Sequence, residues 1–287
     1  MDTFLQACIN GLMIGGFYSL MGMGQNIIFG VMKIINFCHG EMLMVGMYLM
    51  FVFYQLLGIS PYIAIPLVAL VMFCLGALIQ HTLITPSLGT KSFTNLLFLT
   101  VGLGILFTNL AQTIFTSDYR TLTTAHSSDV LALGPVTVGL PKLISFAVLI
   151  ILSIALFFFL KVTPVGKQIR AVSQNPIGAQ VVGIDAKSIY MITYGLGAAL
   201  AGISGALLTL FNVINPTAGS GYGFRALIVV VVGGLGSIPG AFFAGIFLGL
   251  LETLVSLFIG PSVKTLVVFL TFIIILVIRQ NIKLRRA

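Results

Sequence analysis

Long apolar runs recur along the chain and constrain its fold more than any other feature. A helix needs about 20 mostly apolar residues to cross the hydrocarbon core of a bilayer. Eight such runs occur, at Phe4–Phe29, Cys38–Leu57, Tyr62–Ile84, Phe93–Phe115, Leu143–Leu160, Ile189–Val213, Ala241–Phe258 and Val263–Ile278. The sequence therefore predicts an all-α integral membrane protein with about eight transmembrane helices.

The scarcity of charge excludes the main soluble alternatives. Only 7% of the 287 residues are charged, whereas soluble domains carry roughly 25%. So few charged side chains cannot cover the surface of a soluble enzyme, a nucleic-acid-binding protein or a disordered chain. Because the polar segments between runs are mostly short, we expect residues 1–287 to form a single transmembrane domain.

The distribution of cations predicts the orientation of the chain in the membrane. No cation precedes the first apolar run, and Lys33 is the first one in the sequence. This pattern indicates an uncleaved first helix with the N-terminus outside. Ten of the fourteen Lys and Arg residues then fall on the inner side, as the positive-inside rule requires, with the C-terminus in the cytoplasm. Residues 116–141 become a polar external loop.

Two places break the helical pattern at membrane depth, near residues 33–41 and 226–239. The short apolar piece Ala226–Val232 is followed by Gly233, Gly234, Gly236 and Pro239. Irregular backbone survives at that depth only when it is buried in protein or lines a cavity. Both places are therefore predicted to be broken or re-entrant elements, and the second is a candidate for a transport path.

Polar residues inside the apolar regions are candidates for a path or its gates, because ionisable groups are costly in a bilayer. The candidates are Asn36, His39, Gly40, Glu41, Asn212, Gly233, Gly234, Gly236, Ser237 and Glu252. Structural alternatives stay open for the two acids: Glu41 can pair with Lys33, and Glu252 with Arg225 or Lys264. Gln25, Asn26, Asn36 and Asn109 are each expected to form hydrogen bonds between helices rather than to bind a ligand.

Small residues at four-residue spacing predict close contacts between helices. The pattern occurs in the sixth and seventh runs, at Gly197, Ala201, Gly202, Gly205, Gly245 and Gly249. Surfaces of this kind can also slide past each other, as an alternating-access protein requires.

The polar segment 161–188, expected to lie inside, contains the signals of a short capped helix. Asn175 suits the N-cap, Pro176 the first helical position and Gly183 the position after the last turn. A helix over Pro176–Val182 would present apolar side chains in an aqueous compartment. Two interpretations stay open here: a partner protein has a groove for this helix, or the helix lies on the lipid surface.

Several motifs together resemble the permease family of branched-chain amino acid ABC importers (LivH-like). They are Asn10–Leu12, the INFCHGE run Ile35–Glu41, the TPVG run Thr163–Gly166, Arg170-Ala171, Asn175-Pro176, Ala179, Gly183-Ile184, the GGLGS run Gly233–Ser237, Gly240-Ala241 and Glu252. The family usually has Ala where this chain has Cys38. The tail from Arg279 departs from the usual Arg-Pro-x-Gly-Leu ending, which puts the contacts of the tail in doubt.

The resemblance implies a multi-pass subunit of the bacterial inner membrane that forms a path for branched-chain or other hydrophobic amino acids. Its implied partners are a second permease subunit (LivM-like), two ABC ATPases that use ATP and Mg, a periplasmic solute-binding protein and membrane lipids. The implied ATPase-coupling residues are Arg170, Asn175, Pro176, Ala179, Val182, Gly183 and Ile184. Related permeases also move urea, amides or small organic and aromatic acids, so these cargoes stay open.

The chain lacks the motifs that would give it chemistry of its own. It has no Walker A sequence, no HExxH and no G-x-S-x-G, and its three cysteines (Cys8, Cys38 and Cys74) are far apart. No catalytic residue, metal site or cofactor is therefore assigned, and ATP hydrolysis must come from partner subunits. The main alternative is an ion-coupled secondary transporter that uses Glu41, Glu252 and His39 as proton sites; a channel or scaffold is a third class.

Overall fold

The computed structural model describes residues 2–88, 93–124, 127, 129–134 and 136–284. Within these residues the elements are α1 (Asp2–Met32), α2 (His39–Phe51), the π-helical turn η1 (Val52–Leu56), α3 (Pro61–Ile79), the π-helical turn η2 (Gln80–Ile84), α4 (Thr85–Leu88), α5 (Phe93–Phe115), β1 (Val130–Leu133), β2 (Val136–Gly139), α6 (Leu140–Val162), α7 (Pro164–Gln174), α8 (Pro176–Val181), α9 (Ala186–Leu208), α10 (Ala218–Gly233), α11 (Ile238–Phe258) and α12 (Lys264–Leu284).

The helices are those of an integral membrane protein. In the described part of the chain, six helices are long and apolar enough to span a bilayer. They are Asp2–Met32, Pro61–Leu88, Thr94–Phe115, Leu140–Val162, Ala186–Leu208 and Ile238–Phe258. The remaining two apolar runs lie in α2 with η1 and in α12. The all-α membrane class is confirmed, with one short β-hairpin added to it.

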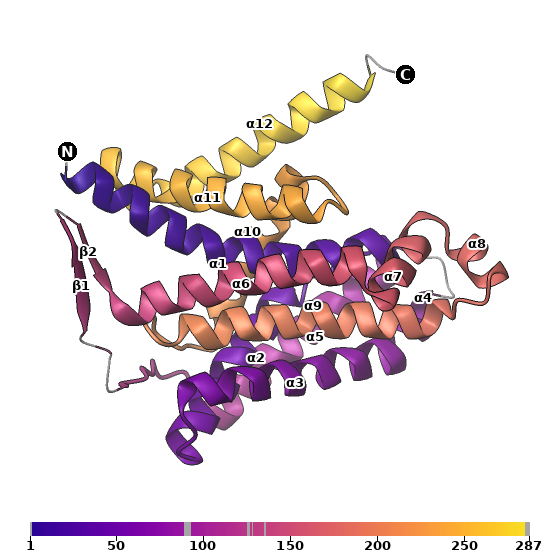
Figure 1. The fold of residues 1–287 in the computed structure, drawn as a ribbon, viewed down its shortest axis with the longest axis horizontal. Helices are drawn as coiled ribbons and strands as arrows, with labels where there is room; N and C mark the ends of the chain where they lie inside the picture. The colour runs from indigo at the N-terminus through magenta and orange to yellow at the C-terminus, as the bar shows by residue number, and fades with distance from the viewer. Residues whose placement is uncertain (1, 89–92, 125–126, 128, 135, 285–287) are drawn as a thin grey trace.

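The bundle has two distinct ends (Figure 1). The hairpin of β1 and β2 lies beside the N-terminus at one end, which we call the hairpin end. Helices α7 and α8 lie at the opposite end, toward which the C-terminal part of α12 also points; we call it the α8 end. Because α1 has 31 residues and a helix rises about 1.5 Å per residue, α1 alone is about 46 Å long.

Helix α9 lies at the centre of the bundle, and small residues on α9 allow its neighbours to approach. In α9, 83% of the membrane-length window is buried. A Cβ on Gly205 would overlap the carbonyl oxygen of Leu43 in α2, and one on Gly202 would overlap the side chain of Met72 in α3. Gly197 lies against Ile28 of α1, and Ala201 is completely buried.

The pair α1 and α11 is joined by backbone-to-backbone contact along its length. A Cβ on Gly249 would overlap the backbone of Gly15, and one on Gly245 would overlap the backbone of Ser19. The hydroxyl of Ser19 also donates to the carbonyl of Phe242 at 2.6 Å. These contacts run in opposite directions along the two helices, so α1 and α11 are antiparallel.

Two polar segments between helices differ from the expectations drawn from the sequence. In the polar segment 116–141, of which residues 125–126, 128 and 135 lie outside the described part, β1 and β2 form an antiparallel hairpin. The hairpin is fixed to α1 because Gln6 exchanges two hydrogen bonds with the backbone of Thr137. Segment 161–188 contains the 11-residue helix α7 in addition to α8. The overlooked signal was the alternation of Val136, Thr137 and Val138 in β2.

Helix α10 is longer than its apolar core suggested. The piece Ala226–Val232 is the second half of a 16-residue helix that begins at Ala218. The chain enters this helix from the hairpin end, where Ile214 pairs with Arg120, and leaves it near Lys161 and Arg170 at the α8 end. Residues 209–237 therefore carry the chain from one end of the bundle to the other.

We expect the substitution Gly245→Ala to destabilise the protein, because its methyl group would push α11 away from Ser19 in α1. Overpacking of this kind costs about 1–3 kcal/mol of unfolding free energy. Gly102→Ala in α5 is the matched control, since nothing lies within 4 Å of a Cβ there. The measurement is the thermal unfolding midpoint in detergent micelles. Equal midpoints for the two variants would contradict the packing of α1 on α11.

Candidate functional site

The break between α10 and α11 is built from glycines and held by one side chain of α1. Gly234 and Gly236 have φ angles of 102° and 83°, a left-handed region that residues with a Cβ rarely adopt. Asn26, completely buried in α1, donates to the carbonyls of Gly234 at 3.0 Å and Ser237 at 2.7 Å. Its Oδ1 accepts from the N–H of Gly236 at 2.6 Å. One amide thus satisfies three backbone groups of the break.

The two helices on either side of the break are tightly apposed and capped. A Cβ on Gly240 would overlap the carbonyl oxygen of Gly233. The hydroxyl of Ser237 accepts from the N–H of Gly240 at 3.2 Å and caps the start of α11. At the end of α10, Arg279 from α12 donates to the carbonyls of Val231 and Val232 at 2.7 and 2.9 Å. The break is therefore a rigid element of defined shape.

A second break, residues 33–38, separates α1 from α2. Lys33 ends α1 with a positive φ of 58°, and Asn36 Oδ1 accepts from the N–H of Cys38 at 3.2 Å. A Cβ on Gly40 would overlap the carbonyl of Gly219, so α2 begins in contact with the start of α10. The proposed Lys33–Glu41 pair is not formed: Lys33 Nζ donates to the carbonyl of Gly30 at 2.8 Å.

Glu41 lies at a mainly apolar cavity between α2, α5 and α10 that also has amide and hydroxyl side chains in its lining. The cavity has a volume of about 340 Å³, and Asn36 and Gln25 line it together with Glu41. On the opposite wall, α5 contributes Thr108 and Asn109. The structure thus brings together two residues of the 33–41 candidate set, and it adds Gln25, whose buried Oε1 has no hydrogen-bond partner in the described structure.

His39 is completely buried and does not line this cavity. Its Nε2 lies 3.1 Å from the carbonyl oxygen of Met21 in α1. This contact fixes the first turn of α2 against α1. The position of His39 is that of a packing residue.

Glu252 pairs with Arg225, one of the two partners that the sequence left open. Arg225 Nε donates to Glu252 Oε1 at 2.6 Å, and Tyr18 donates its hydroxyl to Glu252 Oε2 at 2.8 Å. Arg225 also donates to the carbonyl of Gly221. The cluster joins α1, α10 and α11. Asn212 is connected to it through Tyr222: the Asn212 amide donates to the Tyr222 hydroxyl at 2.9 Å, and the ring of Tyr222 lies 6.5 Å from that of Tyr18. Breaking such a buried pair from one side costs about 3–5 kcal/mol, because a charge is left without its partner.

Helix α8 is short, capped at both ends and exposed. Asn175 Oδ1 accepts from the N–H of Gly178 at 2.9 Å, and Gly183 has a φ of 87° after the last turn. Ile184 N–H closes the turn by donating to the carbonyl of Ala179 at 3.0 Å. The helix ends at Val181, one residue earlier than the sequence suggested.

The side chains of α8 divide into an inner and an outer face. Ile177, Val181 and Val182 are 76%, 82% and 74% exposed, whereas Ala179 is only 4% exposed. Figure 1 shows α8 projecting beyond the ends of the long helices. Three apolar side chains therefore stand on the projecting element, and Ala179 attaches that element to the rest of the loop.

Asp185 fixes the exit from α8 into α9. Its carboxylate accepts from the hydroxyl of Ser188 and the N–H of Lys187, and these bonds hold its pKa below the ordinary value. Because the folded-state pKa is lowered, this cap contributes above the ordinary pKa of an aspartate and is lost as the pH falls through the lowered value. The N-terminal cap of α9 is therefore formed at neutral pH.

Arg170, the basic residue of the expected coupling set, lies on α7 rather than on α8, and its side chain is exposed. Its Nη2 lies 3.3 Å from the carbonyl of Lys161. Tyr18 and Arg279 are residues of the site that sequence reasoning missed, and Asn26 was expected only to join helices. A polar residue within an apolar run can indicate that its side chain is buried. It does not indicate which residue on another helix the side chain contacts.

These observations define the chain as a polytopic α-helical membrane protein whose helices are broken at membrane depth. Among the described residues, no group of three His, Cys, Asp or Glu side chains could hold a metal ion. The chain belongs to the branched-chain amino acid transport system permease component family, whose sequence model matches residues 7–278. The resemblance seen in the sequence motifs is thereby confirmed.

Individual relatives span nearly the whole chain. The high-affinity branched-chain amino acid transport system permease protein BraD of Pseudomonas aeruginosa is 28% identical over 97% of this chain and 94% of its own length. LivH of Salmonella typhimurium is 30% identical over 96% of this chain and 93% of its own length. The ribose import permease protein RbsC of Haemophilus influenzae is 26% identical over 59% of this chain and 55% of its own length. No solved structure is significantly similar to the chain.

We expect Asn26→Leu to loosen the α10–α11 break, because it removes the partner of three partly buried backbone groups. A fully buried group left without a partner costs about 1–3 kcal/mol, and these partly buried groups cost less. Hydrogen–deuterium exchange of the peptide covering 233–241 should therefore accelerate. Asn109→Leu is the control, since Asn109 is exposed and bonds only its own helix at Ile105. Unchanged exchange in Asn26→Leu would show that Asn26 does not hold the α10–α11 break.

Proposed function

We propose that this chain is a permease subunit of a bacterial ABC importer. It pairs with a second, similar permease subunit, two ABC ATPases and an external solute-binding protein, and it binds no cofactor itself. The ATPases supply ATP hydrolysis with Mg. Family membership supports the transport role, and the observation that carries the coupling to ATPases is α8 with three exposed apolar side chains.

The proposed orientation puts the hairpin end outside and the α8 end in the cytoplasm of the inner membrane. If only the eight apolar runs crossed the membrane, both termini would lie on the same side. We infer one further crossing, made by residues 209–237 with α10, and this supports an N-terminus outside and a C-terminus inside. The cations Lys161, Lys167, Arg170 and Lys187 lie in or beside α7 and α8, which supports a cytoplasmic location by the positive-inside rule. The whole chain then forms one transmembrane domain, with 116–141 as the loop that receives the binding protein.

The proposed path passes the cavity beside Glu41 and the α10–α11 break. Movement of α8 by the ATPases reaches the break through α7, because Arg170 of α7 and Ser237 of the break line the same cavity. The break in turn is attached to α1 by Asn26. The contacts on α1, α9 and α11 between glycines let these helices shift as units.

Side-chain contacts favour the importer over the ion-coupled alternative. Glu252 is held by Arg225 and Tyr18, and His39 is buried against the carbonyl of Met21. Two of the three proton-site candidates therefore have structural roles. Glu41 is the one of the three that lines a cavity.

Branched-chain or other hydrophobic amino acids are the proposed cargo, because the two full-length relatives described above carry branched-chain amino acid transport in their names. The partial similarity to a ribose permease shows that related chains serve different cargoes. In an importer of this kind the solute-binding protein sets much of the selectivity. Urea, amides and small organic or aromatic acids are the alternative cargoes.

We expect Ile177→Glu and Val181→Glu to abolish binding-protein-dependent uptake without loss of folding, because both side chains are exposed. Burial of a hot-spot residue contributes about 2 kcal/mol or more to an interface, so ATPase affinity should fall at least roughly thirtyfold. The measurements are uptake of labelled leucine and co-purification of the ATPase. Ala179→Arg is unsuitable for this test, since Ala179 is buried.

Gln168→Glu on α7 is the matched control for that test, because it adds the same charge at an exposed position of the same loop. Normal uptake in both α8 variants would contradict the importer proposal. Ion-driven uptake by the chain alone in proteoliposomes would support the secondary transporter instead. Uptake of urea or small acids in place of leucine, with the same loss in the α8 variants, would change the cargo and leave the coupling intact.

A further inference from the structure

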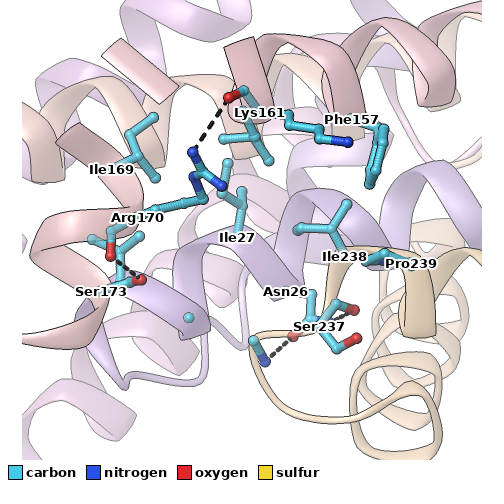
Figure 2. A pocket seen from close by; sticks show the side chains of 14 residues that line it. Asn26, Ile27, Phe157, Lys161, Ile169, Arg170, Ser173, Ser237, Ile238 and Pro239 are labelled. Atoms are coloured by element: carbon cyan, nitrogen blue, oxygen red, sulfur yellow. Dashed lines mark hydrogen bonds between the residues drawn. The ribbon is translucent and has the colours of Figure 1, made fainter. Parts of the chain in front are cut away.

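A groove with two different halves runs between α6 and α11 at the α8 end. Its first half is a cavity of about 390 Å³ lined by α1, α6, α7 and the α10–α11 break (Figure 2). Its second half is a cavity of about 270 Å³. The halves adjoin, because both are lined by Phe157, Ile238 and Pro239.

The first half is basic. Lys161 and Arg170 line it, and both side chains are exposed. Lys161 Nζ lies 5.8 Å from the ring centroid of Phe157, and Figure 2 shows it extending along the edge of the cavity toward that ring. No carboxylate lines either half among the described residues. Two cations without an acidic neighbour at the rim of a membrane protein attract an anion.

The second half is apolar and open to the outside of the bundle. Phe158 and Phe243, which line it, are 56% and 70% exposed, and Ile154 is 51% exposed. Its one hydroxyl among the lining residues, Ser153, already donates to the carbonyl of Leu149 at 2.8 Å. From Ser153 to Lys161 the groove follows α6 for about 12 Å, at 1.5 Å per residue.

We propose that this groove binds an anionic phospholipid of the leaflet that surrounds the α8 end. The phosphate group lies between Lys161 and Arg170, and an acyl chain lies along Phe157, Phe158 and Phe243. Charge complementarity selects the head group, and the adjoining apolar half selects a ligand with a hydrocarbon chain. A free phosphate would use only the first half, and an uncharged lipid only the second.

A lipid bound in this groove would contact two functional segments of the chain. Arg170 belongs to α7, which leads into α8, and Ser237 and Gly236 belong to the α10–α11 break. The lipid therefore contacts both the loop that carries α8 and the break that Asn26 holds. This site is independent of which cargo the protein carries.

The chain contains no Trp, so a single introduced Trp can report lipid at the groove. Full-length Phe243→Trp is reconstituted in phosphatidylcholine bilayers that contain brominated phosphatidylglycerol or, separately, brominated phosphatidylcholine. We expect phosphatidylglycerol to quench the fluorescence at much lower mole fractions. Each cation near a membrane surface contributes roughly a fivefold preference for anionic lipid, so Lys161→Gln and Arg170→Gln should each reduce the preference about fivefold.

The controls separate the groove from general surface charge. Lys167→Gln with Lys187→Gln removes two exposed cations that do not line the groove, and it should keep the preference. Lys161→Arg should also keep it, which distinguishes loss of charge from misfolding. Equal quenching by both lipids, or a preference lost only in the Lys167 and Lys187 variant, would overturn the proposal. Displacement by soluble glycerol phosphate would also overturn it, because it would assign the site to a free anion.

Discussion

The structure depends on one constraint: backbone groups that leave the helical hydrogen-bond pattern between two membrane helices must find partners elsewhere in the protein. Between α10 and α11 that partner is Asn26, which satisfies two carbonyls and one N–H of the break. Arg279 satisfies the carbonyls at the end of α10. The break can therefore exist as a rigid corner, and any movement of the break is passed directly to α1.

The hydrogen bonds of the buried polar residues distinguish those that join helices from those that line a cavity. Asn26 and Glu252 have partners on neighbouring segments and so hold helices together. His39 contacts α1 through Nε2, while its buried Nδ1 has no partner in the described structure. Glu41 and Gln25 instead line a cavity between α2, α5 and α10, and the Oε1 of Gln25 lacks a partner in the described structure. An unsatisfied group at a cavity is the kind of position that a polar cargo or water can use. This difference is the physical reason to place the path beside Glu41.

Local signals predicted much of the fold. The caps of α8 at Asn175 and Gly183 depend on neighbouring residues, and they formed as expected. The partners of Asn26 and Glu252 depend on how distant helices meet, which spacing along one helix does not determine. The burial of Ala179 on the inner face of α8 has the same cause. A capped six-residue helix can be recognised from its sequence, but its exposed face depends on α7 and α9.

We have proposed that partner ATPases act on this chain through α8. The most direct measurement is disulfide cross-linking of Val181→Cys, in a chain whose three native cysteines are replaced by Ala, to single cysteines around the groove of the co-expressed ATPase. The account predicts a cross-link that forms in high yield and changes with bound nucleotide. If the introduced cysteine forms no cross-link, and reacts instead with a membrane-impermeant reagent added from outside the cell, both the coupling role and the orientation are contradicted.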